Sequence, residues 1–307
     1  MDKISVVIPT IGRSRLLDCL YSLKKQSLLP SEILVVDNSQ DGTAKIIVDR
    51  YFSEHGHKVV RYIHEKKEGV YNARNRGIFE AKYDSICFID DDCVADKNWI
   101  LELYNATITH KKKSIIRGEN MNGDPNNLFA CVEYFDEQMF FKKDFFVAKK
   151  NIISFWLDSK NFIVSKKLIN KNKITFRDYK MGEDLDFSLQ AITKNIFVLY
   201  CQKARIYHFG RTDFFHHMIR EIKKGREASK LSKYWNLQHN STLTKTMLNK
   251  QIIWKKWEEN NHLENKLITE IFIGKNFLFK ISFRFLLTIN HLINSIFFYI
   301  SQHLIDK

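Results

Sequence analysis

The sequence is poor in the residues that make linkers and covalent cross-links. Its 307 residues include only 3 prolines and 11 glycines, which argues against long flexible linkers. The 5 cysteines form no Cys-x-x-Cys pair, and their odd number and irregular spacing favour free thiols in a reducing compartment. No charged leader followed by a long apolar stretch opens the chain, so we expect no signal peptide.

Positive charge is what the chain has in excess. The formal net charge is +14, and 44% of the residues are hydrophobic, enough for one large core or for one domain plus a smaller appendage. A basic balance favours polyanionic partners, namely nucleic acid, an anionic membrane face or phosphorylated substrates. A solvated lysine-rich surface would give the same composition, so charge alone does not choose a function.

Short β-branched runs alternate with helical patterns through the first ninety residues. We expect strands over 4–8, 33–36, 59–63 and 85–89, and helices over 15–25, 43–52 and 69–81. This alternation predicts an α/β fold with a mostly parallel sheet flanked by helices. Ligands of such sheets bind at the carboxyl ends of the strands, so the polar residues after each strand are the candidates. Residues 99–180 show no clear pattern.

The strongest local signal is the run Asp90-Asp91-Asp92 directly after a buried strand. Three adjacent carboxylates repel one another, and a cation among them relieves the repulsion. Oxygen ligands suit Mg²⁺ or Mn²⁺, which also bind phosphate oxygens. The competing interpretation is an acidic loop that caps the next helix near Asp96.

Four further motifs are weaker when each is taken alone. Asp37-Asn38-Ser39 can accept hydrogen bonds from a nucleobase or a ribose, but it is also ordinary turn chemistry. Residues 69–77 open a helix with nearby arginines, which suits a phosphate or a basic surface. The acids at 183–186 either stabilise a helix start or supply a general base. His208 can complete a metal shell or be structural.

The order of these motifs resembles glycosyltransferase family two, an inverting family with the GT-A fold. The matching elements are Val6-Val7-Ile8-Pro9-Thr10 with Arg13, Val35 to Ser39, Gly69 with Ala73-Arg74-Asn75 and Gly77, Asp90-Asp91-Asp92, Asn161 with Lys166, Gly182-Glu183-Asp184-Leu185-Asp186, and His208. They cover about residues 3 to 230. The segment 111–155 carries little of the family's pattern and is expected to shape the acceptor site.

The resemblance implies a role for each motif. Asp37 would contact the nucleobase, most often uracil, Asp90 the ribose side, and Arg74 the phosphates. The donor would be bound by Pro9, Thr10, Arg13, Asp37, Asn38, Arg74, Asp90 and Asp91. A divalent metal, Mn²⁺ or Mg²⁺, would be held by Asp90, Asp92 and His208. Asp184 would be the catalytic base, with Glu183 beside it.

The end of the chain differs from the rest. We expect a catalytic domain over 1–230 and a helical, basic and apolar extension over 231–307. The basic stretch 217–233 contains Arg220, Lys224 and Arg226, which suit a diphosphate or a solvated helix. The uncharged run 285–305 is long enough to span a bilayer, but polar residues interrupt it with amphipathic spacing.

These features predict a location. We expect a cytoplasmic enzyme held peripherally on the inner face of the cell membrane by its tail from about Ile268 onward. The alternative is that the tail packs on the catalytic domain or forms a homodimer.

Three functions remain to be compared. The leading hypothesis is a glycosyltransferase that moves a sugar from a nucleotide donor, a UDP-sugar, to a lipid-linked glycan in surface polysaccharide synthesis. A nucleotidyltransferase of the same fold also uses an aspartate pair and a metal, but its first loop is usually glycine-rich, and residues 9–13 hold only Gly12. A basic nucleic-acid-binding protein would leave Asp90 to Asp92 unexplained, so we expect no nucleic acid as partner.

Overall fold

A computed structural model describes residues 2–56, 59–142, 145–148, 151–154, 156–179, 182–210, 213–223, 255–256, 271, 274–275 and 277–303. The chain divides into two compact units. Unit 1 comprises Met1–Met121, Asn151–Asp178 and Glu183–His208, and unit 2 comprises Asn122–Lys150, Tyr179–Gly182 and Phe209–Lys307. The predicted domain boundary at residue 230 lies outside the described residues and stays a prediction.

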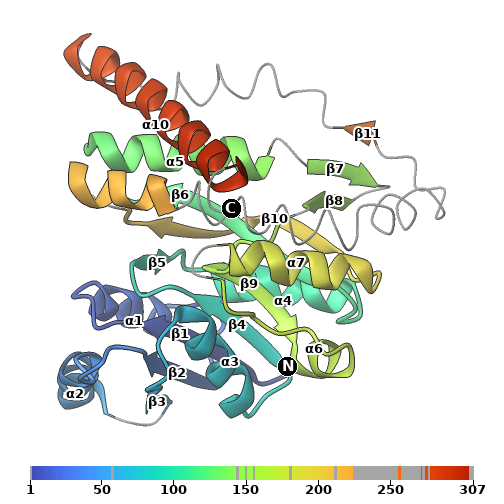
Figure 1. Ribbon diagram of the computed structural model, residues 1–307. Coiled ribbons are helices and arrows are strands. Elements are labelled where there is room, and N and C mark those ends of the chain that lie inside the picture. The colour runs from blue at the N-terminus through green and yellow to red at the C-terminus, as the bar shows by residue number, and fades with distance from the viewer. Residues whose placement is uncertain are drawn as a thin grey trace. The chain divides into compact units, whose positions relative to one another are not determined.

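Unit 1 is built on one mixed sheet (Figure 1). Its strands are β1 (Ile4–Thr10), β2 (Glu32–Asp37), β3 (Val60–His64), β4 (Ser85–Ile89), β5 (Cys93–Ala95), β6 (Ile115–Asn122), β8 (Asn151–Ser154), β9 (Asn161–Ser165) and β10 (Val198–His208). The order β3-β2-β1-β4 is parallel throughout. Beyond β4, strand β9 runs antiparallel to β4, and β6 runs antiparallel to β9. The predicted parallel region is thus confirmed, and an antiparallel half extends it.

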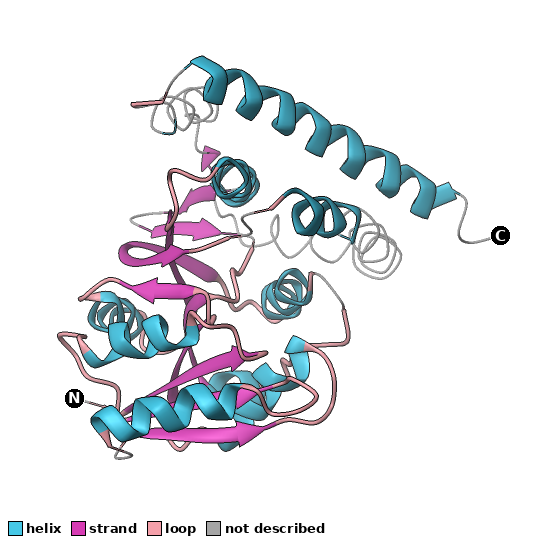
Figure 2. Cartoon of the chain, turned by 90° about the vertical axis from the view of Figure 1, so that its left-hand side faces the viewer, coloured by secondary structure: helices cyan, strands magenta, loops and turns pink. Residues whose placement is uncertain are grey.

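The expected helices of the first half are present with small shifts of their ends. The helices of unit 1 are α1 (Leu16–Lys24), α2 (Ala44–His55), α3 (Val70–Glu80), α4 (Trp99–Thr109), α6 (Lys166–Lys171) and α7 (Glu183–Thr193). Helices lie on both sides of the strands (Figure 2), as expected for an α/β sheet. Their apolar faces close a core around fully buried Val7, Leu34, Phe88 and Phe162.

Close approach of helix α3 to strand β1 depends on one glycine. A Cβ atom added to Gly77 would lie 2.3 Å from a Cγ atom of Val7, far inside van der Waals contact. The glycine therefore lets the helix lie directly on the strand. This packing places the N-terminal half of α3, which carries Arg74, near the carboxyl ends of the strands.

The described residues of unit 2 include the helical segments α5 (Leu128–Lys142), residues 214–223 and the long α10 (Phe277–His303). An apolar cluster holds α10 on α5, with Phe283 meeting Phe135 edge to face at 5.8 Å. The strands β7 (Phe145–Ala148) and β11 (Lys255–Lys256) pair antiparallel in this unit.

One face of the tail therefore packs on protein, as the alternative interpretation expected. Leu286 and Asn290 are buried with Phe283 on this face of α10. Among the described residues, no helix combines the length and apolar character needed to cross a bilayer. Lys224 and Arg226 of the basic stretch lie outside the described residues.

Candidate active site

The carboxyl ends of β1, β2 and β4 meet at one edge of the sheet, as expected. Thr10 lies opposite Asp37 in the register of β1 and β2. The Thr10 hydroxyl donates to the Asp91 carboxylate at 2.5 Å, which joins β1 to the loop after β4. Pro9 precedes Thr10 within β1 and lies opposite Val36. The motifs after these three strands therefore come together.

The guanidinium of Arg13 contacts two of the three adjacent aspartates. Its guanidinium donates to Asp91 at 2.7 Å and lies 3.2 Å from Asp92. Asp91 is fully buried. Burial raises the pKa of Asp91, and the nearby Arg13 charge opposes that increase. With both carboxylate oxygens engaged by Thr10 and Arg13, Asp91 holds the loop together.

Arginine 74 connects the strand edge to helix α7. Its guanidinium donates to Glu183 at 2.6 Å and to Asp90 at 3.2 Å, and only 3% of the residue is exposed. Burial lowers the pKa of Arg74, but the charges of Asp90 and Glu183 outweigh it, so the guanidinium stays charged. Its Nε is buried, and none of the described residues forms a hydrogen bond with it. The ring of Phe176 lies 5.5 Å from the guanidinium carbon.

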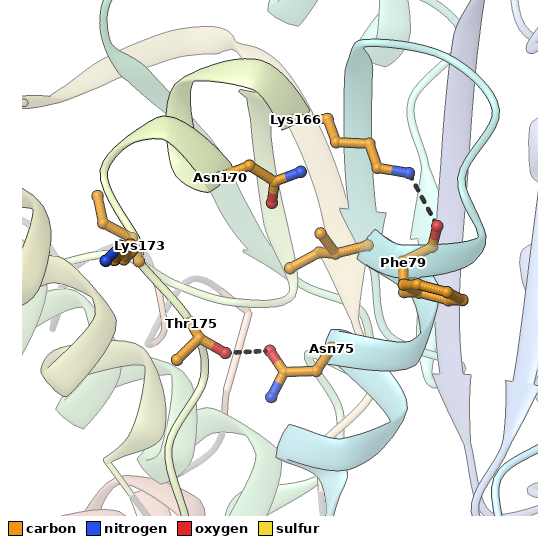
Figure 3. Close-up of a pocket in the computed structure, with 8 residues that line it drawn as sticks. Asn75, Phe79, Lys166, Asn170, Lys173 and Thr175 are labelled. Atoms are coloured by element: carbon orange, nitrogen blue, oxygen red, sulfur yellow. Dashed lines mark hydrogen bonds between the residues drawn. The ribbon is translucent and has the colours of Figure 1, made fainter.

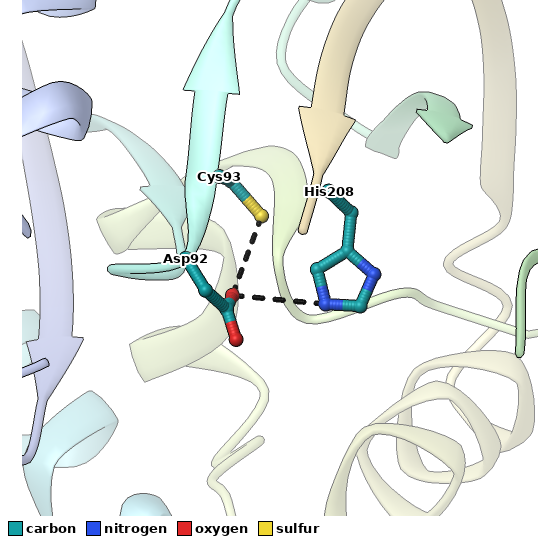
Figure 4. A group of neighbouring side chains, drawn as sticks. All are labelled: Asp92, Cys93 and His208. Carbon is teal, nitrogen blue, oxygen red and sulfur yellow. Dashed lines mark hydrogen bonds and ion pairs between the residues drawn. The ribbon is translucent and has the colours of Figure 1, made fainter. Parts of the chain in front are cut away.

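The third aspartate, Asp92, is also part of a second cluster (Figure 4). Asp92 Oδ1 lies 3.7 Å from His208 Nε2 and 3.7 Å from Cys93 Sγ. The candidate ligand atoms of these three residues all lie within 4.8 Å of one another. The pairing of His208 with Cys93 across β10 and β5 brings the histidine here from far along the chain.

The structure thus brings two of the three predicted metal ligands together. Asp92 and His208 are neighbours, whereas Asp90 pairs with Arg74. Among the described residues, the group of candidate ligand atoms that contains Asp92 and His208 does not include Asp90. Cys93 was not among the predicted residues, although it directly follows the aspartate run. Its pKa is raised by burial and by the nearby carboxylates of Asp92 and Asp90.

Asp37 and Asn38 form internal hydrogen bonds at the end of β2. The buried Asp37 carboxylate accepts from Ser39 N, Ala44 N and the Tyr62 hydroxyl, each at 2.9 Å. Asn38 bridges to the next loop, because its amide oxygen accepts from Gly69 N at 2.8 Å. Both residues shape the loops at this edge, and the nucleobase contact of Asp37 stays a prediction.

Three carboxylates open helix α7, and two of them are bonded to arginines. Glu183 pairs with Arg74, and the fully buried Asp186 accepts from Arg177 at 2.7 and 2.5 Å. Asp184 is half-buried and accepts from Leu185 N at 2.8 Å. Burial, followed by the charges of Glu183 and Asp158, raises the pKa of Asp184 to about 7, against the opposing charge of Arg74.

Asp158 is a neighbour that sequence reasoning missed. It is buried, accepts from the Asn120 amide and pairs with Lys160 at 3.0 Å. No motif surrounds it in the sequence, so only the fold shows that it influences Asp184. The predicted acceptor-side residue Asn161 is also buried, and its side-chain oxygen accepts from Trp99 Nε1 at 2.7 Å.

A separate pocket of about 440 Å³ lies between α3 and the segment that contains α6 (Figure 3). Lys166 borders it and donates to the carbonyl oxygens of Phe79 and Ala81 at the end of α3. Asn75 accepts from the Thr175 hydroxyl at 2.9 Å. The carboxylates described above do not line this pocket.

Comparison with known proteins decides between the three functions. A model described as Glycosyl transferase family 2 matches residues 5–155, the segment that contains the first four motifs. Residues 5–155 of the chain belong to glycosyl transferase family 2. The resemblance inferred from the motifs is thus confirmed. The match disfavours the two alternative functions, a nucleotidyltransferase and a nucleic-acid-binding protein.

Relatives of this family 2 member come from archaea and bacteria. Glycosyltransferase AglE of Haloferax volcanii is 33% identical over 135 residues, which cover 43% of this chain and 43% of that protein. Poly(ribitol-phosphate) beta-N-acetylglucosaminyltransferase TarP of Staphylococcus aureus is 24% identical over 285 residues, 88% of this chain and 80% of that protein. The first curated relatives are matched over 43%, 42% and 54% of their length, so the chain spans about half of them.

The solved structures agree on the fold. The crystal structure of S. aureus TarS matches with a TM-score of 0.50 and 19% identity, covering 98% of this chain and 55% of that chain. This likeness, together with the family match, confirms the predicted GT-A fold.

Proposed function

We propose that the chain is an inverting glycosyltransferase that moves a sugar from a nucleotide-diphosphate donor, a UDP-sugar, to an acceptor hydroxyl. The observation that carries this proposal is the carboxylate of Asp184 at the start of α7, whose pKa is raised to about 7. A general base works best when its pKa lies near the operating pH. Family membership supplies the reaction class, and Asp184 supplies the group that the acceptor needs.

In the proposed reaction, Asp184 takes the proton of the acceptor hydroxyl as the hydroxyl oxygen attacks the anomeric carbon. The bond from that carbon to the diphosphate oxygen breaks, and the nucleoside diphosphate leaves with the electron pair. One displacement inverts the anomeric carbon, so no sugar–enzyme bond forms, unlike in retaining glycosidases with paired carboxylates. Glu183 accepts a hydrogen bond from Arg74 and lies next to the base in the sequence.

Arginines 13 and 74 are the cationic groups at the strand edge. Each is tied to aspartates of the run that follows β4, Arg13 to Asp91 and Arg74 to Asp90. In this proposal Arg74 lies beside the donor phosphates, and its buried Nε–H supplies a donor for one phosphate oxygen. The loops organised by Asp37 and Asn38 receive the base and the ribose.

A divalent cation fits this site by the chemistry of its donor set. Asp92 and His208 offer a carboxylate oxygen and an imidazole nitrogen within 4.8 Å of one another, a combination that suits Mn²⁺. We propose these two residues as its ligands, with Asp90 nearby as in the initial hypothesis. When bound, the ion supplies Lewis-acid stabilisation of the charge that develops on the leaving diphosphate.

The acceptor in this proposal is a phosphate-bearing, lipid-linked glycan of a bacterial surface polymer. The net charge of +14 favours a polyanionic substrate. The relative TarP is named for a poly(ribitol-phosphate) acceptor, which is such a polyanion. Nucleotide sugars and free thiols are both cytosolic, so we propose that the reaction occurs at the cytoplasmic face of the membrane.

Replacing the base tests the proposal. We expect Asp184→Asn to lower the rate of sugar transfer by about 10²–10⁴-fold. The dissociation constant of UDP, measured by calorimetry with Mn²⁺ present, should stay within about twofold of the wild-type value. Asp49→Asn, on the exposed face of α2, is the matched control and should keep full activity. Near-normal turnover in Asp184→Asn would contradict the assignment of the base.

A further inference from the structure

Helix α10 carries a second apolar face in addition to the one that packs on α5. Five large apolar side chains at helical spacing are exposed: Leu278 by 71%, Ile281 by 49%, Phe285 by 68%, Leu292 by 58% and Ile296 by 44%. We call these five residues the α10 stripe. Contiguous exposed apolar residues of this size mark interaction sites in soluble proteins.

The stripe cannot be hidden by rotating the helix, because the opposite face is fixed by specific contacts. Asn290 is fully buried and bonds to His217 Nε2 at 2.9 Å and to Asp136 at 3.2 Å. Phe283 and Leu286 fill the apolar cluster of unit 2 on the same face. Turning the α10 stripe inward would break the hydrogen bond between Asn290 and His217 and would expose the side chain of Phe283 to solvent.

The charges beside the stripe indicate which partner it fits. Lys280 and Arg284 belong to α10, and the helix contains no aspartate or glutamate between Phe277 and His303. A second copy of the same helix would bring like charges together, because its sequence contains basic residues and no acidic ones. An anionic surface would complement them, and phenylalanine, leucine and isoleucine are the residues that enter the headgroup–acyl boundary of a bilayer.

We propose that the α10 stripe docks on an anionic lipid surface, with the helix lying parallel to the membrane plane. The inner face stays on α5, the stripe enters the boundary of the bilayer, and Lys280 and Arg284 meet the phosphate headgroups. This deepens the proposed function by naming the surface that holds the enzyme near a lipid-linked acceptor. Docking is measured without catalysis, so its failure and the failure of the proposed function are distinguishable.

Vesicle flotation of the full chain tests the proposal. The protein should float with vesicles of phosphatidylcholine containing about one-third phosphatidylglycerol, and much less with phosphatidylcholine alone. The double variant Phe285→Ser with Leu292→Ser should lower the partition coefficient at least about tenfold, because two apolar groups no longer leave water. Ile46→Ser is the matched control, since Ile46 is 75% exposed on α2 of unit 1.

Variants that remove a positive charge from α10 provide a second test of lipid binding in case the serine variant does not fold. Lys280→Gln and Arg284→Gln should each lower binding to the anionic vesicles about fivefold, since a basic residue near such a surface contributes about 1 kcal/mol. Unchanged flotation of the serine variant would mean that overall charge alone binds the lipid, and it would overturn the proposal. A wild-type chain that sediments as a dimer, does not float, and becomes monomeric in the serine variant would show a second copy as the partner.

Discussion

At the scale of single residues, the acidic groups of the site differ in what neutralises them. Asp91 is bonded by Thr10 and Arg13, and Asp186 is bonded by Arg177. Burial raises the pKa of Asp184 to about 7, and the carboxylates of Glu183 and Asp158 add to that increase. Residues that are adjacent in the sequence therefore have different chemistry, because the fold gives each a different partner.

The raised pKa of Asp184 predicts a pH dependence. The carboxyl is protonated below its pKa and cannot accept a proton, so kcat/KM should rise with pH through about 7 and then level off. Glu183→Gln removes a negative neighbour and releases Arg74, and both effects lower the pKa of Asp184. The acid limb should therefore move to lower pH, as measured in a pH series of initial rates. A limb that stays in place or moves upward would show that another group titrates.

Asp186 should behave as a structural residue. It is fully buried and accepts two bonds from Arg177 and one from Gln190 Nε2 at 2.7 Å. We expect Asp186→Ala to lower the free energy of unfolding by about 3 kcal/mol in urea denaturation, because bonds to a charged group are lost and polar groups are left buried. Asp184→Asn should cause no such loss, since burial disfavours the Asp184 charge. Equal destabilisation by both changes would contradict the separation of roles.

Sequence patterns pointed to candidate site residues that lie in motifs, and they did not point to the neighbours of those residues that lie outside motifs. Asp184, His208 and Asp92 stand in recognisable patterns. Asp158 has no such pattern, and it reaches Asp184 only through the fold. Cys93 joins Asp92 and His208 because β5 pairs with β10, a pairing that local periodicity does not predict.

At the scale of elements, apolar periodicity predicted the parallel half of the sheet because its strands are short, buried and separated by helices. The antiparallel strands β6 and β9 could not be predicted in the same way. Their order in the sheet depends on pairing between segments far apart in the sequence, and polar residues such as Asn120 and Asn161 are buried there. These amides bond to each other, so burial does not require apolar side chains at those positions.

Gly77 supplies a prediction about the packing of α3. In an exposed helix, alanine is more favourable than glycine by about 1 kcal/mol. Here a Cβ atom would meet Val7 at 2.3 Å, so Gly77→Ala should destabilise the fold by about 1–3 kcal/mol. Thermal unfolding measures this, with the neighbouring surface substitution Arg76→Ala as a control that should change little. A stabilised Gly77→Ala variant would show that α3 does not press on β1.

At the scale of the whole molecule, a strongly basic chain combines a family 2 sheet edge with a helical unit. The net charge of +14 was compatible with nucleic acid, membrane or phosphorylated substrates. The family match and the carboxylates at the strand ends favour the phosphorylated substrate that we propose, and the exposed face of α10 is the basis of the proposed membrane contact. Composition restricted the classes of partner, whereas the placement of residues led to a separate proposal for each part of the chain.

The central claim is metal-dependent sugar transfer from a nucleotide donor, and release of nucleoside diphosphate tests it most directly. The full chain would be incubated with Mn²⁺ and a panel of UDP-, GDP- and TDP-sugars, with and without excess EDTA. The account predicts release of one nucleoside diphosphate, strongest from UDP donors, that EDTA abolishes and that Asp92→Asn reduces by at least about tenfold. Full release in EDTA with no metal retained, or no release from any donor by the folded chain with acceptor present, would contradict it.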